Sequence, residues 1–451
     1  MLNDTTGAVV HRGVVVNGVS QATLRRWLTR ILAVLGAAGL IATYIRSVSP
    51  PGVDYVAYYD AGGWIRAGAR LYERSLIWRD VGYAPEYPMP MPDGMQFVYP
   101  PVFAFAFSPL TLLPVNTAFA MWLGVLFAAL MGATWLLLRL LLPKHMSPSL
   151  SIVLAAAAAA AFFQPMRTIL ITGQVDVVIL LLLVLALRAF VRGEDIQVGL
   201  WLALAVAIKP TLGFLVLFLV WKRAYRAVVA CGVVAFVLLA VPFIGAGGTP
   251  TVLDYVAVSG FLSSVAFDVS PINQSPYGML LRLFTVNAYT VPVLVAPLLP
   301  LVGRALLTVG TLGALAWMVC RSRDIPVHQQ ALEYSLFIIG LLLAGPLSEA
   351  GHYGYLLLPL AAVASGVIAD TTGPRMRIPT AVALLALFAY LCLPSLTPMD
   401  LAFFAYWQEP VRGLKLVMTG MHLYGLLGVA ALTMATLAST ARFGSPRRES
   451  A

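Results

Sequence analysis

Charged residues are scarce in this chain, at 11% of 451 residues, whereas a soluble globular domain carries roughly 25%. A soluble protein with so few charges would expose large apolar patches and aggregate. Hydrophobic residues make up 60% of the chain, and apolar runs of about 18 residues recur between Trp27 and Ala441. Lipid tolerates such runs, so the composition predicts an all-α integral membrane protein.

Cysteine is rare as well, and its placement excludes a disulfide framework. Each of the three cysteines lies within an apolar run: Cys231, Cys320 and Cys392. The same placement argues against a metal site, and we expect neither a metal ion nor another cofactor.

The few charges are unevenly distributed, with an excess of basic residues that gives a net charge of +10. These basic residues form short clusters between apolar runs and no stripe interleaved with aromatic residues, which excludes nucleic acid as a partner. Clusters of this kind favour the cytoplasmic side of a membrane. We therefore expect a lipid bilayer to surround the protein.

The apolar runs predict about twelve membrane-spanning helices in one membrane domain, residues 27–441. The first span, 27–45, follows two arginines and is too long for a cleavable signal, so residues 1–26 form a cytoplasmic tail. Residues 442–451 form a second cytoplasmic tail. The other predicted spans are 117–142, 149–163, 175–191, 197–208, 211–221, 226–243, 300–320, 331–345, 353–369, 377–393 and 414–438.

Two segments between the first two spans stand apart from this pattern. Residues 46–97 are polar and rich in acids and tyrosines, which predicts a large first outer loop. Residues 98–114 are apolar but short, and four prolines interrupt them, which favours a re-entrant piece. If 98–114 crossed the membrane, the basic loops that follow would face outward, against the charge rule.

The first outer segment carries the candidate catalytic base. Asp54 stands just past the end of the first span, near the depth of a lipid phosphate headgroup. A glycosyl transfer needs a base that takes the proton from the acceptor hydroxyl, and a carboxylate at this boundary suits that task. The alternative is a solvated acid or a helix cap, and Asp60 has the same two interpretations.

Basic side chains at the outer ends of spans are candidates for binding a lipid-linked phosphate. Lys209 lies between apolar helices, where a charge is costly and usually functional, although it could instead reach the interface. Arg167 has the same two interpretations, and Asp176 either pairs with one of these two or caps its helix. His352 could donate to a phosphate oxygen or position the acceptor; the alternative is a packing role.

Several polar outer residues are candidates for contacts with a sugar or an acceptor. The turn around Asn273 and Gln274 offers amides, although a bare turn is a weak signal. The full set assigned to sugar or acceptor binding is Tyr58, Tyr59, Asp60, Gln174, Asn273, Gln274 and Glu349.

The ordered set of outer motifs resembles the GT-C superfamily of membrane glycosyltransferases, and within it glycosyltransferase family 87. The likeness covers roughly residues 45–370. It rests on Asp54-x-x-x-Tyr58-Tyr59-x-Ala-Gly, Tyr99-Pro-Pro through Pro109 to Pro114, Gly173-Gln174-Val-Asp176, Lys209-Pro210-Thr211, Asn273-Gln274-Ser275 and His352-Tyr353.

This resemblance implies a GT-C fold and an inverting, metal-independent transfer from a polyprenyl-phosphate sugar to a lipid-linked or cell-envelope glycan on the outer face. It implies that Asp54 is the base and that His352 lies near the donor or acceptor. The chain departs from the mannosyltransferases of the family by having Val56 two residues after the aspartate, and Ser-Glu-Ala-Gly before the histidine.

Mannose is the first expectation for the sugar, and arabinofuranose is the alternative; both departures count against mannose. A secondary transporter is a further alternative, but transporters usually have inverted repeats and acids near the midplane, and here no repeat is apparent and the acids gather in outer segments. A scaffold or flippase-like partner in envelope assembly is the last alternative.

Overall fold

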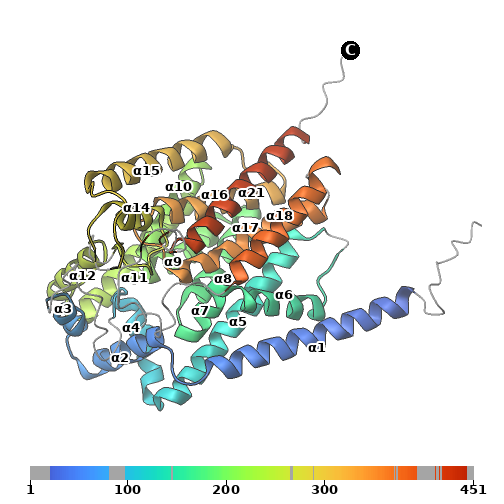
Figure 1. The fold of residues 1–451 in the computed structure, drawn as a ribbon. Helices are drawn as coiled ribbons and strands as arrows, with labels where there is room; N and C mark the ends of the chain where they lie inside the picture. The colour runs from blue at the N-terminus through green and yellow to red at the C-terminus, as the bar shows by residue number, and fades with distance from the viewer. Residues whose placement is uncertain are drawn as a thin grey trace, which may run out of the picture.

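The computed structural model describes residues 21–80, 97–143, 146–264, 268–287, 289–369, 371, 374–393, 412, 416 and 419–443. Throughout these ranges the regular elements are helices, and none of them is a β-strand (Figure 1). Most of the predicted N-terminal tail (1–20), part of the first outer segment (81–96) and residues 444–451 of the predicted C-terminal tail lie outside the described residues.

The helices divide into those that precede Lys209 and those that follow it. The first set is α1 (Gln21–Ser47), α2 (Val53–Ala67), α3 (Glu73–Asp80), α4 (Pro101–Phe107), η1 (Ser108–Leu112), α5 (Val115–Leu141), α6 (Leu150–Phe162), α7 (Gln164–Thr172), α8 (Asp176–Val191) and α9 (Asp195–Ile208). The second set is η2 (Pro210–Leu215), α10 (Val216–Trp221), α11 (Tyr225–Gly245), α12 (Thr249–Leu262), α14 (Pro276–Phe284), α15 (Leu298–Met318), α16 (Val327–Ala344), η3 (Ala350–Leu356), α17 (Leu357–Ile368), α18 (Pro374–Cys392) and α21 (Met421–Phe443).

Helical structure occupies each of the twelve predicted ranges, in two cases as a 3₁₀-helix continued by an α-helix. Seven helices are long and apolar enough to cross a membrane, and an eighth span results if the bent pair α6 and α7 counts as one. The others are shorter: α9, for example, has 14 residues. The chain is therefore a multi-pass membrane protein, and the larger number of about twelve spans stays a prediction.

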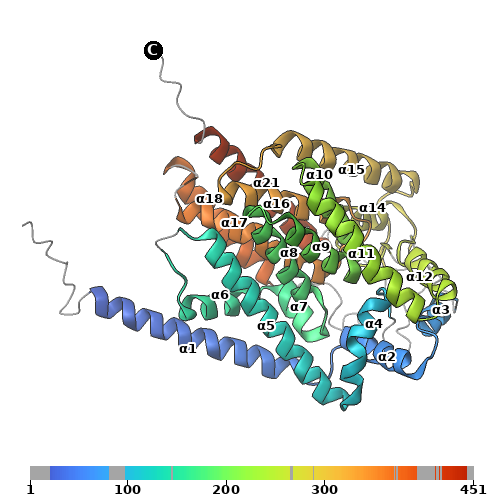
Figure 2. The same cartoon turned by 180° about the vertical axis from the view of Figure 1, so that it is seen from behind.

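The helices form one bundle with apolar outer faces. In both views α1 runs along one edge of the bundle and α15 along the opposite edge (Figures 1 and 2). Only 11% of the apolar window of α15 is buried, and 17% of that of α1 and of α11. Exposed apolar helix faces of this extent are stable only against lipid.

Two helix breaks shape the end of the bundle that carries the candidate site. Helices α6 and α7 meet at 81°, and Pro165 lies in the first turn of α7, where its missing amide costs no hydrogen bond. Helix α9 ends at Ile208 because Pro210 cannot continue it, and Lys209 between them has extended backbone dihedrals. Short helices therefore end inside the bundle, where their side chains can meet.

The predicted first outer loop is folded where it is described. Residues 53–67 and 73–80 form α2 and α3, so Asp54 lies in the first turn of a helix rather than in a loop. An aromatic cluster packs α2, α4 and α5 together; its members are Tyr55, Tyr58, Tyr99, Phe103, Phe107, Phe119 and Trp122. Arg70 and Asp254 join the segment to α12 by two hydrogen bonds of 2.7 and 2.6 Å.

The segment predicted to be re-entrant is broken as its prolines suggest. It consists of α4 and η1, which are seven and five residues long. Neither is long enough to cross a membrane alone. Its placement relative to the bilayer stays a prediction.

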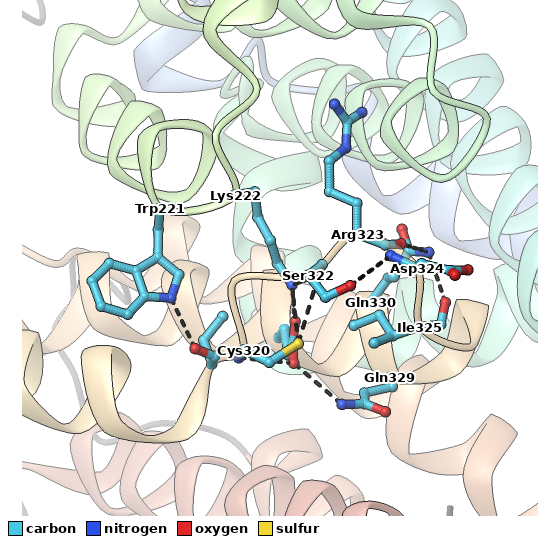
Figure 3. Close-up of polar contacts among 11 residues, drawn as sticks. Trp221, Lys222, Cys320, Ser322, Arg323, Asp324, Ile325, Gln329 and Gln330 are labelled. Carbon is cyan, nitrogen blue, oxygen red and sulfur yellow. Dashed lines mark hydrogen bonds and ion pairs between the residues drawn. The ribbon is translucent and has the colours of Figure 1, made fainter.

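A second polar cluster lies at the opposite end of α8 and α9, where the turns after α8, α10 and α15 meet (Figure 3). Lys222 forms a buried ion pair with Glu333 and also donates to the carbonyl of Ser322 at 2.9 Å. Arg323 pairs with Asp195 at 2.7 Å. This end collects the basic turns that the sequence assigns to the cytoplasmic side.

Candidate functional site

Asp54 is positioned by a close contact between the start of α2 and the end of α7. A Cβ on Gly52 would lie 2.3 Å from the carbonyl oxygen of Thr172, so only glycine permits this approach. Gly173 follows with φ +75, a conformation that glycine adopts without strain. Its carbonyl accepts a 2.7 Å hydrogen bond from Trp122 Nε1, which fixes the turn. Gly52 and Gly173 therefore allow the start of α2, which carries Asp54, to pack against the end of α7.

The Asp54 carboxyl group is buried, with 8% of the residue exposed. Its Oδ2 has no partner in the described part of the chain, and the Thr172 hydroxyl beside the carboxyl group donates to the carbonyl of Thr168 at 3.0 Å. Burial raises the pKa of Asp54 to about 7, Glu349 adds to this rise, and Thr172 and Lys209 oppose it. A carboxylate with a pKa near the working pH and one free oxygen suits a general base.

Lys209 lies beside Asp54 at the end of α9 and is held by Asp176. Its Nζ donates to both carboxylate oxygens of Asp176 at 2.8 Å, and Asp176 is fully buried. This settles the alternatives for Asp176, because the pair forms with Lys209 and not with Arg167. The Lys209 Nζ also lies 5.8 Å from the centroid of the Tyr99 ring. No other acceptor for the third Nζ proton occurs among the described residues.

Glu349 and His352 form a reciprocal cap at the start of η3. The Glu349 backbone N–H donates to His352 Nδ1 at 3.1 Å. In the neutral ring the proton therefore sits on Nε2, which is left as a donor. Gln174 lies close to the Glu349 carboxyl group, and burial raises the pKa of Glu349. The Gln174 Oε1 itself is buried without a partner among the described residues.

The site thus combines free acceptors and free donors at one end of the bundle. The acceptors without a partner are Asp54 Oδ2 and Gln174 Oε1. The available donors are one proton on Lys209 Nζ and the Nε2 side of His352. Hydroxyl groups can complete such acceptors, and the oxygens of a phosphate can complete such donors. Across the described ranges, no three histidine, cysteine or acidic side chains are grouped to hold a metal ion.

A model of glycosyltransferase family 87 matches residues 97–346, which is more than half of the chain. The chain belongs to glycosyltransferase family 87. It is accordingly a membrane glycosyltransferase. The matched range includes Lys209 and Asp176, whereas Asp54, Glu349 and His352 lie outside it.

Two mycobacterial relatives of this glycosyltransferase carry the name polyprenol-phosphate-mannose-dependent alpha-(1-2)-phosphatidylinositol pentamannoside mannosyltransferase. The one from Mycobacterium tuberculosis (strain CDC 1551 / Oshkosh) is 26% identical over 349 residues, 77% of this chain and 74% of the relative. The one from Mycolicibacterium smegmatis (strain ATCC 700084 / mc(2)155) is 25% identical over 359 residues, 79% of this chain and 80% of the relative. No solved structure matches the chain significantly.

Asn273 and Gln274 hold the loop that precedes the Glu349 cap. The Asn273 amide donates to the carbonyls of Asp268 and Pro346 and accepts from the backbone amides of Ser275 and Ser348. The Gln274 amide donates to the carbonyls of Pro271 and Thr419 and accepts from the His422 backbone. Both side chains are fully buried and fully hydrogen-bonded by the protein. Their role in sugar binding stays a prediction, and the contacts that they make fix loops around the site.

The remaining predicted residues of α2 point in different directions. Tyr58 lies one turn after Asp54, and its hydroxyl donates to that of Tyr99 at 3.0 Å. Tyr59 donates instead to the carbonyl of Leu113 at 2.7 Å. Asp60 is half-buried near Arg74; burial raises its pKa and Arg74 opposes the rise. Of these three predicted ligands, only Tyr58 lies near the Asp54 and Asp176 carboxyl groups.

Arg167 is not brought to the site. It is half-buried on α7 and lies near Cys392 on α18. Nothing in the described ranges pairs Arg167 with Asp176. Its assignment to a donor phosphate therefore lacks structural support and stays a prediction.

Two functional neighbours were missed at the sequence level. Thr172 contacts Asp54, and the Tyr355 hydroxyl donates to Asp176 Oδ1. The sequence held no usable signal for Tyr355, because it lies inside a predicted apolar span and the 3₁₀-helix that places it on the same face as His352 is seen only in the fold. The signal for Thr172 was the adjacent Gly173, which marks the end of α7.

Proposed function

We propose that this family 87 glycosyltransferase transfers mannose from a polyprenyl-phosphate donor to a glycolipid or cell-envelope glycan acceptor, with inversion at the anomeric carbon. The donor class and the phosphatidylinositol mannoside type of acceptor are those in the printed names of the two relatives. One observation carries the proposal. A buried carboxylate with a free oxygen lies beside a lysine with a spare proton.

In the proposed reaction Asp54 Oδ2 takes the proton from the acceptor hydroxyl as the hydroxyl oxygen attacks the anomeric carbon. The bond between that carbon and the phosphate oxygen breaks, and the phosphate leaves with the electron pair. The charge on the phosphate rises from about one to about two negative charges. Lys209 Nζ and His352 Nε2–H stabilise this charge, which grows as the bond breaks.

The proposed fold and membrane arrangement follow from the positions of the charges. We place the site on the outer side of the bacterial plasma membrane, because the basic turns around Lys222 and Arg323 gather at the opposite end of the bundle. This arrangement includes about twelve spans in a GT-C fold. A re-entrant segment at 98–114 keeps the number of crossings consistent with the charges.

The first test is product formation by the purified protein in lipid nanodiscs. It is incubated with polyprenyl-phosphate mannose or polyprenyl-phosphate arabinose in parallel, each with a phosphatidylinositol mannoside acceptor, and product masses are measured. A mass increase of one hexose supports the proposal, and one pentose supports the arabinofuranose alternative. No product with either donor would contradict the proposed function.

Asp54→Asn tests the base. The amide cannot take a proton, so we expect kcat to fall about a hundredfold to ten-thousandfold, with donor binding retained. Asp60→Asn is the matched control, because it changes a carboxyl group of the same helix that faces Arg74. We expect it to keep near-normal activity. Equal activity of the two variants would remove Asp54 as the base.

A further inference from the structure

Two buried tyrosines of η3 make separate polar contacts. The Tyr353 hydroxyl donates to the backbone carbonyl of Gln274 at 2.8 Å. The Tyr355 hydroxyl donates to the Asp176 carboxylate, the group that holds Lys209. Both rings are almost inaccessible, at 0% and 2% exposure, and both hydroxyl protons are already donated to protein groups. Only the Tyr355 hydroxyl group therefore contacts a charged residue of the candidate site.

The charge balance of the site explains why the contact of Tyr355 matters. One ammonium group, on Lys209, faces three carboxyl groups, those of Asp54, Asp176 and Glu349. A phosphate that binds Lys209 adds a further negative charge. Asp176 competes with that phosphate for the lysine, because it already accepts two of the three Nζ protons. A hydrogen bond donated to Asp176 from another group spreads its charge and weakens this competition.

Tyr355 also contacts the second proposed phosphate ligand. Its ring lies nearly parallel to that of His352, with centroids 6.3 Å apart and 19° between the planes. The two residues are three apart in a 3₁₀-helix, where such side chains lie over one another. A single side chain thus contacts His352 through its ring and Asp176 through its hydroxyl.

We propose that Tyr355 is a positioning residue that sets the affinity for the donor phosphate, through Asp176 and Lys209 by its hydroxyl and through His352 by its ring. The proposal rests on the proposed use of a polyprenyl-phosphate donor. Tyr355 makes no contact with the donor itself, and its effect is confined to the phosphate. The sugar and the acceptor are recognised elsewhere in the site.

The test is equilibrium binding of two probes to the full-length protein in nanodiscs, polyprenyl-phosphate mannose and polyprenyl phosphate without a sugar. Tyr355→Phe removes only the hydroxyl, and we expect the dissociation constant of polyprenyl-phosphate mannose to rise roughly fivefold and that of polyprenyl phosphate, which carries the larger negative charge, to rise at least as much. Tyr355→Leu also removes the ring contact with His352, and we expect a larger rise of roughly tenfold to thirtyfold. The KM for the acceptor and the kcat at saturating donor should change less than twofold in Tyr355→Phe.

Tyr353→Phe is the matched control, since it removes a hydroxyl of the same short helix that donates to a backbone carbonyl. A purely structural role would lower the thermal midpoint of both variants and leave donor affinity unchanged in both. Unchanged affinity in Tyr355→Phe, or an equal change in Tyr353→Phe, overturns the positioning role. If the unmodified protein binds neither probe, the proposed function fails instead, so the two failures are distinguishable.

Discussion

The described part of the chain contains two buried lysine–carboxylate pairs, one at each end of α8 and α9, and their surroundings differ. Lys222 is almost fully buried, and Glu333, the carbonyl of Ser322 and the thiol of Cys320 accept from its Nζ. Lys209 keeps 13% of its side chain exposed and has Asp176 as its hydrogen-bonding partner. A saturated lysine can only support structure, whereas an unsaturated one can bind a ligand.

The carboxyl groups beside each lysine show the same contrast. Glu333 accepts from Lys222, from the backbone amide of Cys320 and from Gln329. Near Lys209, by contrast, Asp54 Oδ2 has no partner in the described structure. Buried polar groups are normally satisfied, and an exception usually marks a functional site. The number of polar groups without a hydrogen-bond partner, more than burial or charge, distinguishes the Lys209 end of the bundle from the Lys222 end.

The largest expected effect is a loss of stability at the Lys222–Glu333 pair, where the hydrogen bonds of the lysine are all made. Lys222→Met leaves Glu333 buried without its partner, and we expect a loss of about 3–5 kcal/mol of unfolding free energy. The double variant Lys222→Met with Glu333→Met should recover most of this loss. Both are followed by thermal unfolding in detergent through tryptophan fluorescence. If the double variant stays as unstable as the single one, the pair is not the source of the loss.

At the unsaturated end, Lys209→Met should act on binding. We expect the dissociation constant for polyprenyl phosphate to rise roughly tenfold to a hundredfold, because a charged hydrogen bond to the phosphate is lost. The stable double variant of Lys222 and Glu333 is the control, and its affinity should stay within twofold of normal. An equal loss of affinity in both would abolish the distinction between the two lysines.

The pH dependence of turnover sharpens the role assigned to Asp54. Burial raises its pKa to about 7, and the base works only when it is deprotonated. We therefore expect kcat/KM to fall about tenfold per pH unit below pH 7 and to level off above it. Initial rates between pH 5.5 and 8.5, at subsaturating acceptor, measure this. A flat profile would mean that no group with this pKa limits the reaction.

A third buried acid extends the comparison to a group without any partner. Asp268 is fully buried, neither of its carboxylate oxygens has a partner within the described residues, and burial raises its pKa to about 7 from 3.8. Between these pH values the unfolded chain has lost a proton that the folded protein keeps, so stability falls as pH rises and is flat above pH 7.

Asp268→Asn removes this ionisation, and we expect about 1 kcal/mol more stability at pH 8 and a weaker pH dependence. The control is Asp254→Asn, which breaks a hydrogen-bonded pair with Arg70 and should lower stability slightly. Thermal midpoints at pH 5 and pH 8 distinguish the two. A loss of stability at pH 8 in Asp268→Asn would show that the carboxylate has a partner after all.

The sequence was sufficient to predict most of the long helices and several of the charged residues that face one another. Apolar runs identified twelve ranges that contain helices, because lipid exposure demands them. The helices α2, α3, α12 and α14 lie in segments that were predicted as outer loops. Asp54, Lys209 and His352 were recognised because an ionisable side chain at the membrane is costly and is usually retained for a function. Their common location followed from the alternation of span ends.

The contacts made by neutral polar groups could not be predicted. Asn273 and Gln274 have the chemistry of sugar ligands, but backbone groups of distant loops take up their amides. Tyr355 looked like part of an apolar span, and only the fold shows that its hydroxyl meets Asp176. Sequence shows which groups can form hydrogen bonds, whereas tertiary structure decides which bonds are already made.

In the proposed arrangement, the early end of α9 would also set the depth of the site along the membrane normal. Fourteen residues of α-helix span about 21 Å, whereas the hydrocarbon core of a bilayer is about 30 Å thick. With Asp195 at the inner boundary, Lys209 would lie several ångströms beneath the outer one. A lipid headgroup meets it there only where the bilayer thins around the protein, so the protein would deform the membrane to bring its substrate into reach.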